Sequence, residues 1–300
     1  MSSNKSVIRL MALVLASCIS FVSGCESGSS GSVEEAAVEN SAGLNEQPSA
    51  PEPQPQAEPK IPVVAERLPY AEVDDELVYG HFVFPADMID PLPAVILVHE
   101  SWGLNDSIRA RANRLAAEGF IVLAVDLFNG FVASNPAEAR LQMVSVVENV
   151  ESAQENIRQA YAFVRDTAGA PRIGSVGWNF GGGWSLNTAM LFPDELDAAV
   201  IVYGQVTDDH EALNAVNVPI LGLFAGKDRS VTEASVRRFE TALESLRKNY
   251  EIHVYPDADH SFADPIASAY DQETAEDATR RILEFLDLHL SINASESALP

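Results

Sequence analysis

An acid and a histidine, Asp228 and His260, each lie a few residues after a short apolar run in the last third of the sequence. A carboxylate that accepts a hydrogen bond from an imidazole fixes the tautomer of the ring and stabilises its protonated form. Such a pair supplies a general base for attack on a carbonyl carbon. Either residue alone would more often be structural, but the two together at the ends of strand-like runs predict a catalytic pair.

A glycine-rich segment, Gly177–Gly183, lies upstream of this pair, between a strand-like run and a helical stretch. A strand, a tight turn with glycines on both sides of one residue, and a helix are typical of a nucleophile elbow. The glycines are needed because the turn is strained and the helix passes close to neighbouring strands. Residue 179 would be the attacking position, and Asp228 and His260 follow in the chain order nucleophile, acid, base. The segment matches neither a dinucleotide fingerprint nor a phosphate-binding loop, whereas a purely structural glycine-rich turn remains an alternative.

The elements that must position these residues alternate along the chain between two apolar patterns. Several strand-like runs are apolar on consecutive residues, as in Ala94–Val98, which is expected of parallel strands covered on both faces. The alternation predicts an α/β domain with a mostly parallel, doubly wound sheet, in which ligands bind beyond the carboxyl ends of the strands. The expected strands are Leu77–Phe84, Ala94–His99, Ile121–Asp126, Ile173–Gly177, Ala198–Tyr203, Ile220–Phe224 and Glu251–Tyr255, and the expected helices are Ile108–Glu118, Val147–Thr167, Gly181–Leu191, Val231–Arg247 and Gln272–Leu290.

Several motifs stand at or near the predicted strand ends: His99-Glu100-Ser101-Trp102-Gly103-Leu104-Asn105, Asp126-Leu127-Phe128, the Gly177 elbow, Ala225-Gly226-Lys227-Asp228, Asp259-His260-Ser261-Phe262 and Ala269-Tyr270-Asp271. Together they resemble the dienelactone hydrolase family, over about residues 68–290. The resemblance implies the α/β-hydrolase fold, hydrolysis of ester or lactone bonds in small molecules, and no cofactor. In that family the elbow carries a cysteine nucleophile, an aspartate and a histidine complete a triad, and a glutamate after the second strand contacts the thiol.

The resemblance assigns a role to each of several positions in this sequence. The backbone N–H groups of Phe180 and Ser101 would form the oxyanion hole, and Trp102 and Tyr203, at two strand ends, are the candidates for substrate contact. The other histidines show no metal-ligand spacing, so no metal is expected. The roles of nucleophile, acid, base and thiol contact would fall on Asn179, Asp228, His260 and Glu100.

Position 179 departs from the family, because it holds Asn where the family has Cys. A carboxamide cannot form the acyl intermediate that this fold normally uses, and Ser185, the nearest hydroxyl, is expected to point away from the site. Three explanations follow. The protein is catalytically silent and binds a ligand, or Asp228 and His260 activate a water that Asn179 positions, or Asn179 deamidates to Asp, a reaction that the bulk of Phe180 should slow.

The leading hypothesis is an ester or lactone hydrolase, and the alternative is a non-catalytic ligand-binding protein of the cell envelope. A purely structural envelope protein is a weaker third hypothesis. In the namesake enzymes a basic residue after the catalytic histidine grips a substrate carboxylate, whereas this sequence has Asp264 there. An acid would repel a carboxylate, which favours neutral substrates. Arg140 and Arg229 are the candidates for a substitute cation.

The N-terminus resembles a bacterial lipoprotein signal, in which a short apolar run ends at a cysteine that becomes lipidated. Cys25 is the preferred site over Cys18, because the sequence turns polar directly after it. Residue 26 is Glu rather than Asp, which favours the periplasmic face of the outer membrane. An ordinary secretory peptide or an uncleaved anchor is the alternative. The expected organisation is a signal peptide over 1–25, a Pro-, Ser- and Glu-rich tether over 26–62, the hydrolase-like domain over 63–292, and a tail over 293–300.

The net charge and the positions of the cysteines argue against a nucleic-acid partner and against disulfide or thiol chemistry within the domain. The formal net charge of -25 makes nucleic acid an unlikely partner, because such a surface repels phosphate backbones. Both cysteines, Cys18 and Cys25, lie before the domain. No disulfide can therefore link its parts, and no thiol within it can serve as a nucleophile.

Overall fold

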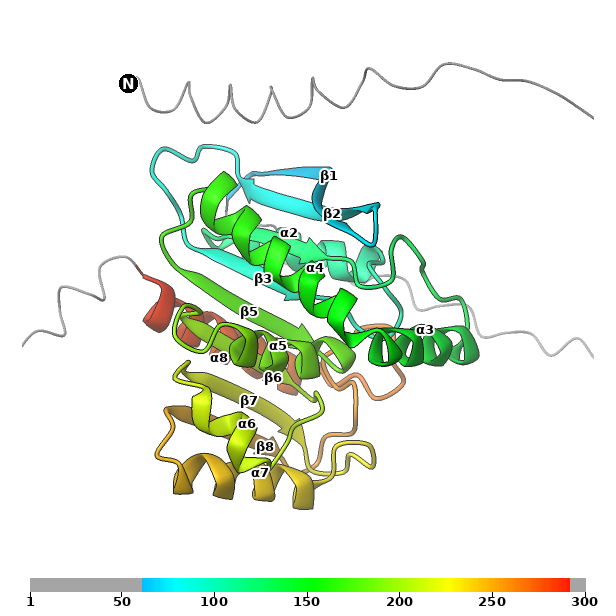
Figure 1. Cartoon of the computed structure of the whole chain (residues 1–300). Coiled ribbons are helices and arrows are strands. Elements are labelled where there is room, and N and C mark those ends of the chain that lie inside the picture. Colours follow the sequence, from blue (N-terminus) through cyan, green and yellow to red (C-terminus); the bar gives the residue numbers. More distant parts are fainter. Residues whose placement is uncertain (1–60, 292–300) are drawn as a thin grey trace, which may run out of the picture. The chain divides into compact units, whose positions relative to one another are not determined.

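The computed structural model describes residues 61–291, which form one α/β unit around an eight-stranded sheet (Figure 1). The strand order is β1-β2-β4-β3-β5-β6-β7-β8. β1 pairs antiparallel with β2 and β2 antiparallel with β4, and all later pairings are parallel. The strands are β1 Val63–Val73, β2 Glu76–Pro85, β3 Ala94–Val98, β4 Ile121–Val125, β5 Ile173–Trp178, β6 Ala198–Val202, β7 Ile220–Ala225 and β8 Tyr250–Tyr255.

Helices cover both faces of the sheet. In Figure 1, α4 lies in front of the sheet and α2 behind it. α2 and α8 bury their apolar sides in one shared core with alternate residues of the inner strands, such as Leu97, Val176 and Val200. Every residue of β3, β4, β5, β6 and β7 is buried, which explains their consecutive apolar residues. The helices are α2 Asp106–Ala117, α3 Pro136–Glu148, α4 Val150–Ala162 with a π-helical end at Phe163–Thr167, α5 Phe180–Leu191, α6 His210–Ala215, α7 Glu233–Ser245 and α8 Gln272–Leu290.

The predicted fold is confirmed. The seven expected strands and five expected helices all form, and the polar motifs follow the carboxyl ends of parallel strands. Because those strands run in the same direction, their ends meet at one edge of the sheet. Asn105, Asn135 and Thr232 cap α2, α3 and α7 by accepting a hydrogen bond from a backbone N–H of the first turn.

Three elements were not predicted from the sequence. β1 was missed because Pro69 interrupts its apolar pattern, and the pairing with β2 shifts register between Pro69 and Ala71. Proline is tolerated there because β1 is an edge strand. α3 lies in the segment between β4 and α4, and its apolar side chains Leu141, Val144 and Val147 are exposed. The short helix α6 was also missed.

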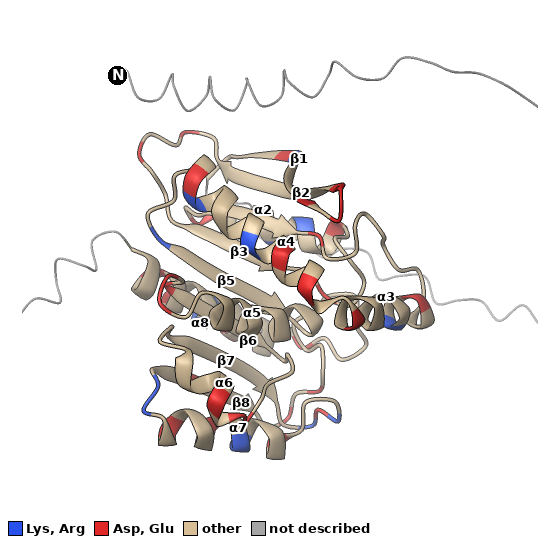
Figure 2. Ribbon diagram, in the orientation of Figure 1, with Lys and Arg blue, Asp and Glu red and all other residues tan. Residues whose placement is uncertain are grey.

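The predicted signal peptide with Cys18 and Cys25, the predicted tether up to residue 60 and the predicted tail over 293–300 lie outside the described residues. Among residues 61–291, no helix has the length and apolarity that a bilayer crossing requires. Figure 2 shows acidic residues spread over helices and loops, with few basic residues between them.

Candidate active site

The predicted elbow lies between β5 and α5, with Asn179 at its turn. Asn179 has φ 53° and ψ −116°, a conformation that costs a non-glycine residue on the order of 1–3 kcal/mol and needs support from its surroundings. Its N–H donates to the Val202 carbonyl at 2.9 Å, and its own carbonyl accepts from the Gly182 N–H at 3.0 Å. A Cβ on Gly177 would lie 1.9 Å from the Gly181 carbonyl oxygen. The turn can therefore be this tight only with glycine at that position.

The structure brings Asp228 and His260 together, as the sequence predicts. Asp228 Oδ2 lies 2.6 Å from His260 Nδ1, and Asp228 Oδ1 accepts from the N–H groups of Ser230 and Val231 at 2.7 and 3.0 Å. The Asp228 side chain is fully buried, whereas that of His260 is 27% exposed. The carboxylate thus orients the ring, and the imidazole remains accessible to a reacting molecule.

The elbow and the Asp228–His260 pair lie at the same edge of the sheet. Val202, which accepts the Asn179 N–H, is followed by Tyr203 at the end of β6. The Tyr203 ring packs against the His260 ring with centroids 5.3 Å apart. Tyr203 has φ 38° and is fully buried. Its ring therefore forms part of the buried packing that holds the imidazole of His260 in place. Its direct contact with substrate stays a prediction.

The stability of the fold depends on the protonation state of Asp228. Burial by itself raises the pKa of this carboxyl, but the hydrogen bonds from His260, Val231 and Ser230 outweigh burial and hold the pKa below its ordinary value. A lowered pKa stabilises the fold above the ordinary pKa of aspartate, and this contribution is lost as the pH falls through the folded-state value.

Asp228→Asn is therefore expected to lower the free energy of unfolding by about 1.5–3 kcal/mol at about pH 7. The difference from wild type should shrink below about pH 4, where the wild-type carboxyl becomes protonated. Urea denaturation across this pH range measures both effects. Asp257→Asn is the control, because the Asp257 side chain is 95% exposed. An equal loss at every pH would contradict the ionic role.

Glu100 forms a buried ion pair with an arginine that the sequence analysis did not single out. Glu100 Oε1 lies 3.1 Å from Nη2 of Arg111 on α2, and both side chains are under 10% exposed. Arg111 also donates to the Ala263 carbonyl at 3.0 Å and lies 4.5 Å over the Trp178 ring. Burial raises the pKa of Glu100, Arg111 opposes that rise, and nearby Asp264 adds to it. Arg111 therefore connects three parts of the site: the end of β3, the strand β5 before the elbow, and the loop after His260.

Three buried polar atoms of this cluster have no hydrogen-bond partner among the described residues: Glu100 Oε1, Arg111 Nε and the Tyr203 hydroxyl. Buried polar atoms are normally satisfied, and unsatisfied ones often mark functional sites or bound water. Arg111 could have been found from the sequence, because it shares a helix face with Ile108, Ala112 and Leu115. A charged residue on an apolar helix face requires a buried partner.

His99 holds the backbone of Glu100 in place. Its Nε2 accepts from the Leu127 N–H at 3.1 Å, so its Nδ1 carries the proton and donates to the Glu100 carbonyl at 2.6 Å. Burial lowers the pKa of His99, against the opposing influence of Asp126. His99 is thus a neutral structural residue beside the site rather than a second base.

The other predicted residues are placed as follows. Within the described part of the chain, the N–H groups of Phe180 and Ser101 donate to no protein acceptor, as an oxyanion hole requires. Trp102 is partly exposed, and its carbonyl accepts from the Ala133 N–H. Ser185 is buried and bonded to Ser175 at 2.8 Å, away from the site as predicted.

Asp264 is buried near Glu100 and Arg111, whereas Arg140 and Arg229 are exposed. The buried cation of the site is therefore Arg111 and neither of the two arginines proposed from the sequence. In residues 61–291, no group of three or more His, Cys, Asp or Glu side chains is arranged to hold a metal ion.

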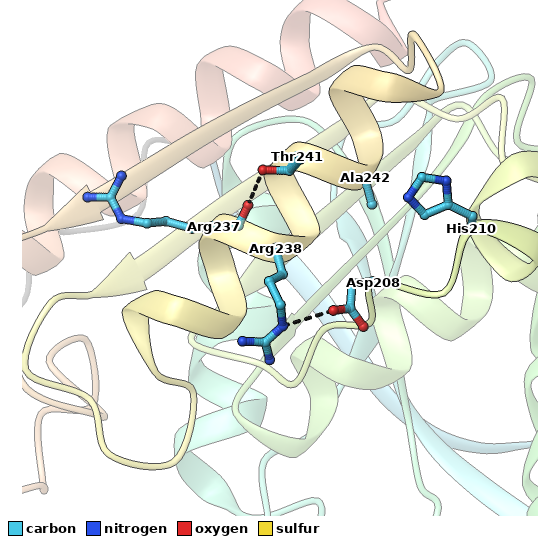
Figure 3. Close-up of a pocket in the computed structure, with 6 residues that line it drawn as sticks. All are labelled: Asp208, His210, Arg237, Arg238, Thr241 and Ala242. Carbon is cyan, nitrogen blue, oxygen red and sulfur yellow. Dashed lines mark hydrogen bonds and ion pairs between the residues drawn. The ribbon is translucent and has the colours of Figure 1, made fainter.

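A hollow of about 280 Å³ lies elsewhere, between α6 and α7 (Figure 3). Its lining excludes Asn179, Asp228 and His260, and its Arg238 is paired with Asp208 at 2.8 Å. We therefore assign the chemistry to the strand ends and not to this hollow.

Comparisons with known proteins agree with this geometry. A family model described as "Dienelactone hydrolase family" matches residues 79–290. A "Putative carboxymethylenebutenolidase" of Saccharolobus solfataricus is 31% identical over 240 residues, covering 68% of this chain and 92% of that protein. A protein of the same name from Escherichia coli K12 is 32% identical over 217 residues, covering 67% and 79%. The crystal structure of "Putative Dienelactone Hydrolase" from Klebsiella pneumoniae is 26% identical with a TM-score of 0.67, covering 75% of this chain and 98% of that one.

Proposed function

Because this chain belongs to the dienelactone hydrolase family, hydrolases of ester and lactone bonds, we propose that it hydrolyses small neutral esters or lactones with a water activated by His260. One observation carries the proposal. The Asp228–His260 pair has the geometry of a general base, at 2.6 Å, beside an elbow whose side chain cannot attack. A base without a protein nucleophile can act on water.

In the proposed reaction, His260 Nε2 takes a proton from a water that attacks the carbonyl carbon of the substrate. Asp228 stabilises the imidazolium that forms. The Phe180 and Ser101 N–H groups bind the oxyanion, and the Asn179 amide positions the water. His260 then returns the proton to the leaving alcohol. Removal of a triad nucleophile leaves roughly 10³-fold acceleration over water, so a slow enzyme is expected.

The charges around the site support a neutral substrate. Glu100, Asp264 and Asp228 are buried acids there, whereas Arg111 is the cation among them and is already paired with Glu100. A substrate carboxylate would meet an excess of negative charge without a free cation to bind it.

We expect the purified protein to hydrolyse short-chain activated esters slowly, with neutral esters faster than anionic ones. His260→Ala should remove the activity above background, because it deletes the base. His210→Ala is the matched control, since His210 lies in the hollow between α6 and α7. Release of the chromophore, followed by absorbance, measures all three. Faster turnover of anionic esters would contradict the neutral-substrate proposal.

The alternative is a ligand-binding protein that keeps the pocket without turnover. Three buried polar atoms of the Glu100, Arg111 and Tyr203 cluster make no hydrogen bond of normal geometry among the described residues, although Glu100 is ion-paired with Arg111. This unfilled hydrogen-bonding capacity is consistent with a bound polar group and with either function. Binding of a lactone by calorimetry, together with an inert wild type, would favour this alternative.

We further propose that the mature chain is lipidated at Cys25 and tethered to the periplasmic face of the outer membrane, with the catalytic domain over 63–292. The cysteine after a short apolar run and the polar tether support this. Labelling with a fatty acid in Cys25→Ser and Cys18→Ser tests it. Label retained in Cys25→Ser and lost in Cys18→Ser would overturn the choice of Cys25.

A further inference from the structure

We propose that Asn179 is a site of self-modification, where the elbow closes the side-chain amide onto the next backbone nitrogen and converts the residue to Asp. This inference goes beyond the proposed hydrolysis. It concerns the chain's own covalent structure and holds whether or not a substrate is turned over.

The backbone of Asn179 has the geometry that the reaction needs. Conversion begins with attack of the Phe180 nitrogen on Cγ of Asn179, which closes a five-membered imide ring. In that ring the Phe180 nitrogen must eclipse Cβ of Asn179. Viewed along the Cα–C bond, the backbone nitrogen and Cβ of a residue are about 120° apart because Cα is tetrahedral, so the ψ of −116° brings the Phe180 nitrogen almost into line with Cβ. Helical and extended residues hold the two atoms far from this alignment.

The surrounding structure maintains this conformation. Asn179 donates to Val202 and accepts from Gly182 through its backbone. A Cβ on Gly181 would lie 2.2 Å from the Val98 carbonyl oxygen, which shows how closely the start of α5 packs on the neighbouring strand. The rare backbone conformation is therefore imposed by the fold, whereas the unfolded chain populates it only to a small extent.

The reacting groups are also available. In the part of the chain that the structure describes, neither the Asn179 side chain nor the Phe180 N–H makes a hydrogen bond. Both residues are partly exposed, so water can reach them. The Phe180 N–H lies at the N-terminus of α5, where the helix dipole stabilises the anion formed when the nitrogen loses its proton.

The bulk of Phe180 was expected to slow this reaction. In a flexible peptide, a large side chain on the attacking residue hinders the closed conformation. Here the backbone already occupies that conformation, so the bulk costs little extra.

The reaction balances without a redox step. The Phe180 nitrogen loses a proton and bonds to Cγ of Asn179, the bond from Cγ to the amide nitrogen breaks, and this nitrogen leaves as ammonia. Water then adds to Cγ, the imide C–N bond breaks, and the Phe180 nitrogen regains its proton. One water is consumed and one ammonia is released. Opening at the other carbonyl would add a main-chain carbon, which the close glycine packing leaves no room for. The carboxylate of Asp can act as a nucleophile, which the amide cannot.

The test compares folded and unfolded protein by peptide mass spectrometry during incubation in neutral buffer, without any substrate. Conversion makes a peptide about 1 Da heavier. We expect the Asn179 peptide to convert at least about tenfold faster in the folded protein than in guanidinium chloride. Asn129-Gly130 is the internal control, because glycine hinders attack least and this pair should convert fastest in the unfolded chain.

An Asn179 amide that persists in the folded protein, after Asn129 has fully converted in the unfolded sample, would overturn the proposal. So would equal rates for Asn179 in both states. Asn179→Gln is the matched variant, because its longer side chain cannot close the five-membered ring, and its peptide should keep its mass. Since mass is read without substrate, failure here is distinct from failure of the proposed hydrolysis.

Discussion

Asn179→Cys is expected to raise the rate of activated-ester hydrolysis roughly 10³-fold or more over wild type. The thiol would be placed at the turn between β5 and α5 that presents the nucleophile in this fold. His260 would deprotonate it, Asp228 already orients His260 at 2.6 Å, and the Phe180 and Ser101 N–H groups are free for the oxyanion. Steady-state kinetics and a burst of acyl-enzyme measure the gain.

Two variants separate nucleophile restoration from an unspecific effect. Asn179→Ala should show no gain, because it opens the same space without a thiol. Asn179→Cys combined with His260→Ala should lose most of the gain, because the thiol then lacks its base. A folded Asn179→Cys protein with wild-type activity would mean that the pocket no longer admits an ester in the reactive orientation.

Arg111→Met is expected to lower the free energy of unfolding by about 3–5 kcal/mol. The substitution keeps much of the volume against Trp178 but leaves the Glu100 and Asp264 carboxyl groups buried without their cation. Removal of one partner of a buried ion pair costs more than the pair itself contributes. Urea denaturation at neutral pH measures the loss.

The control is Arg109→Met, whose arginine is 39% exposed and pairs with the exposed Asp106, so its effect should stay below about 1 kcal/mol. Adding Glu100→Gln to Arg111→Met should recover part of the loss, since it removes one uncompensated charge. A loss in Arg111→Met no larger than in Arg109→Met would show that the buried pair does not stabilise the domain.

The fold could be predicted because local pattern and tertiary environment agree over most of the domain. The consecutive apolar residues of β3 to β7 are those of strands buried on both faces, and the strands form as expected. β1 could not be predicted, because its stability comes from ten cross-strand partners in β2 rather than from its own interrupted pattern. α3 was missed for a related reason, since its apolar residues are exposed and show no clear buried face.

The site residues that belong to sequence motifs could be predicted, whereas a residue that reaches the site only through tertiary packing could not. Asp228, His260 and the elbow follow strand ends, so the sequence places them on one edge of the sheet. Arg111 reaches the same edge of the sheet from α2, and its partners Glu100 and Ala263 lie far apart in the chain. Such a contact depends on how α2 packs against the sheet, which one sequence does not specify.

The irregular outer strand has a consequence for association between copies of the molecule. β1 is an edge strand of the sheet. A continuous row of unpaired peptide groups along such an edge would recruit a strand from another copy. Pro69 offers no N–H, the register shift beside it bends the row, and Glu72 is exposed on the same strand. These interruptions discourage edge-to-edge pairing between the sheets of two copies of the chain.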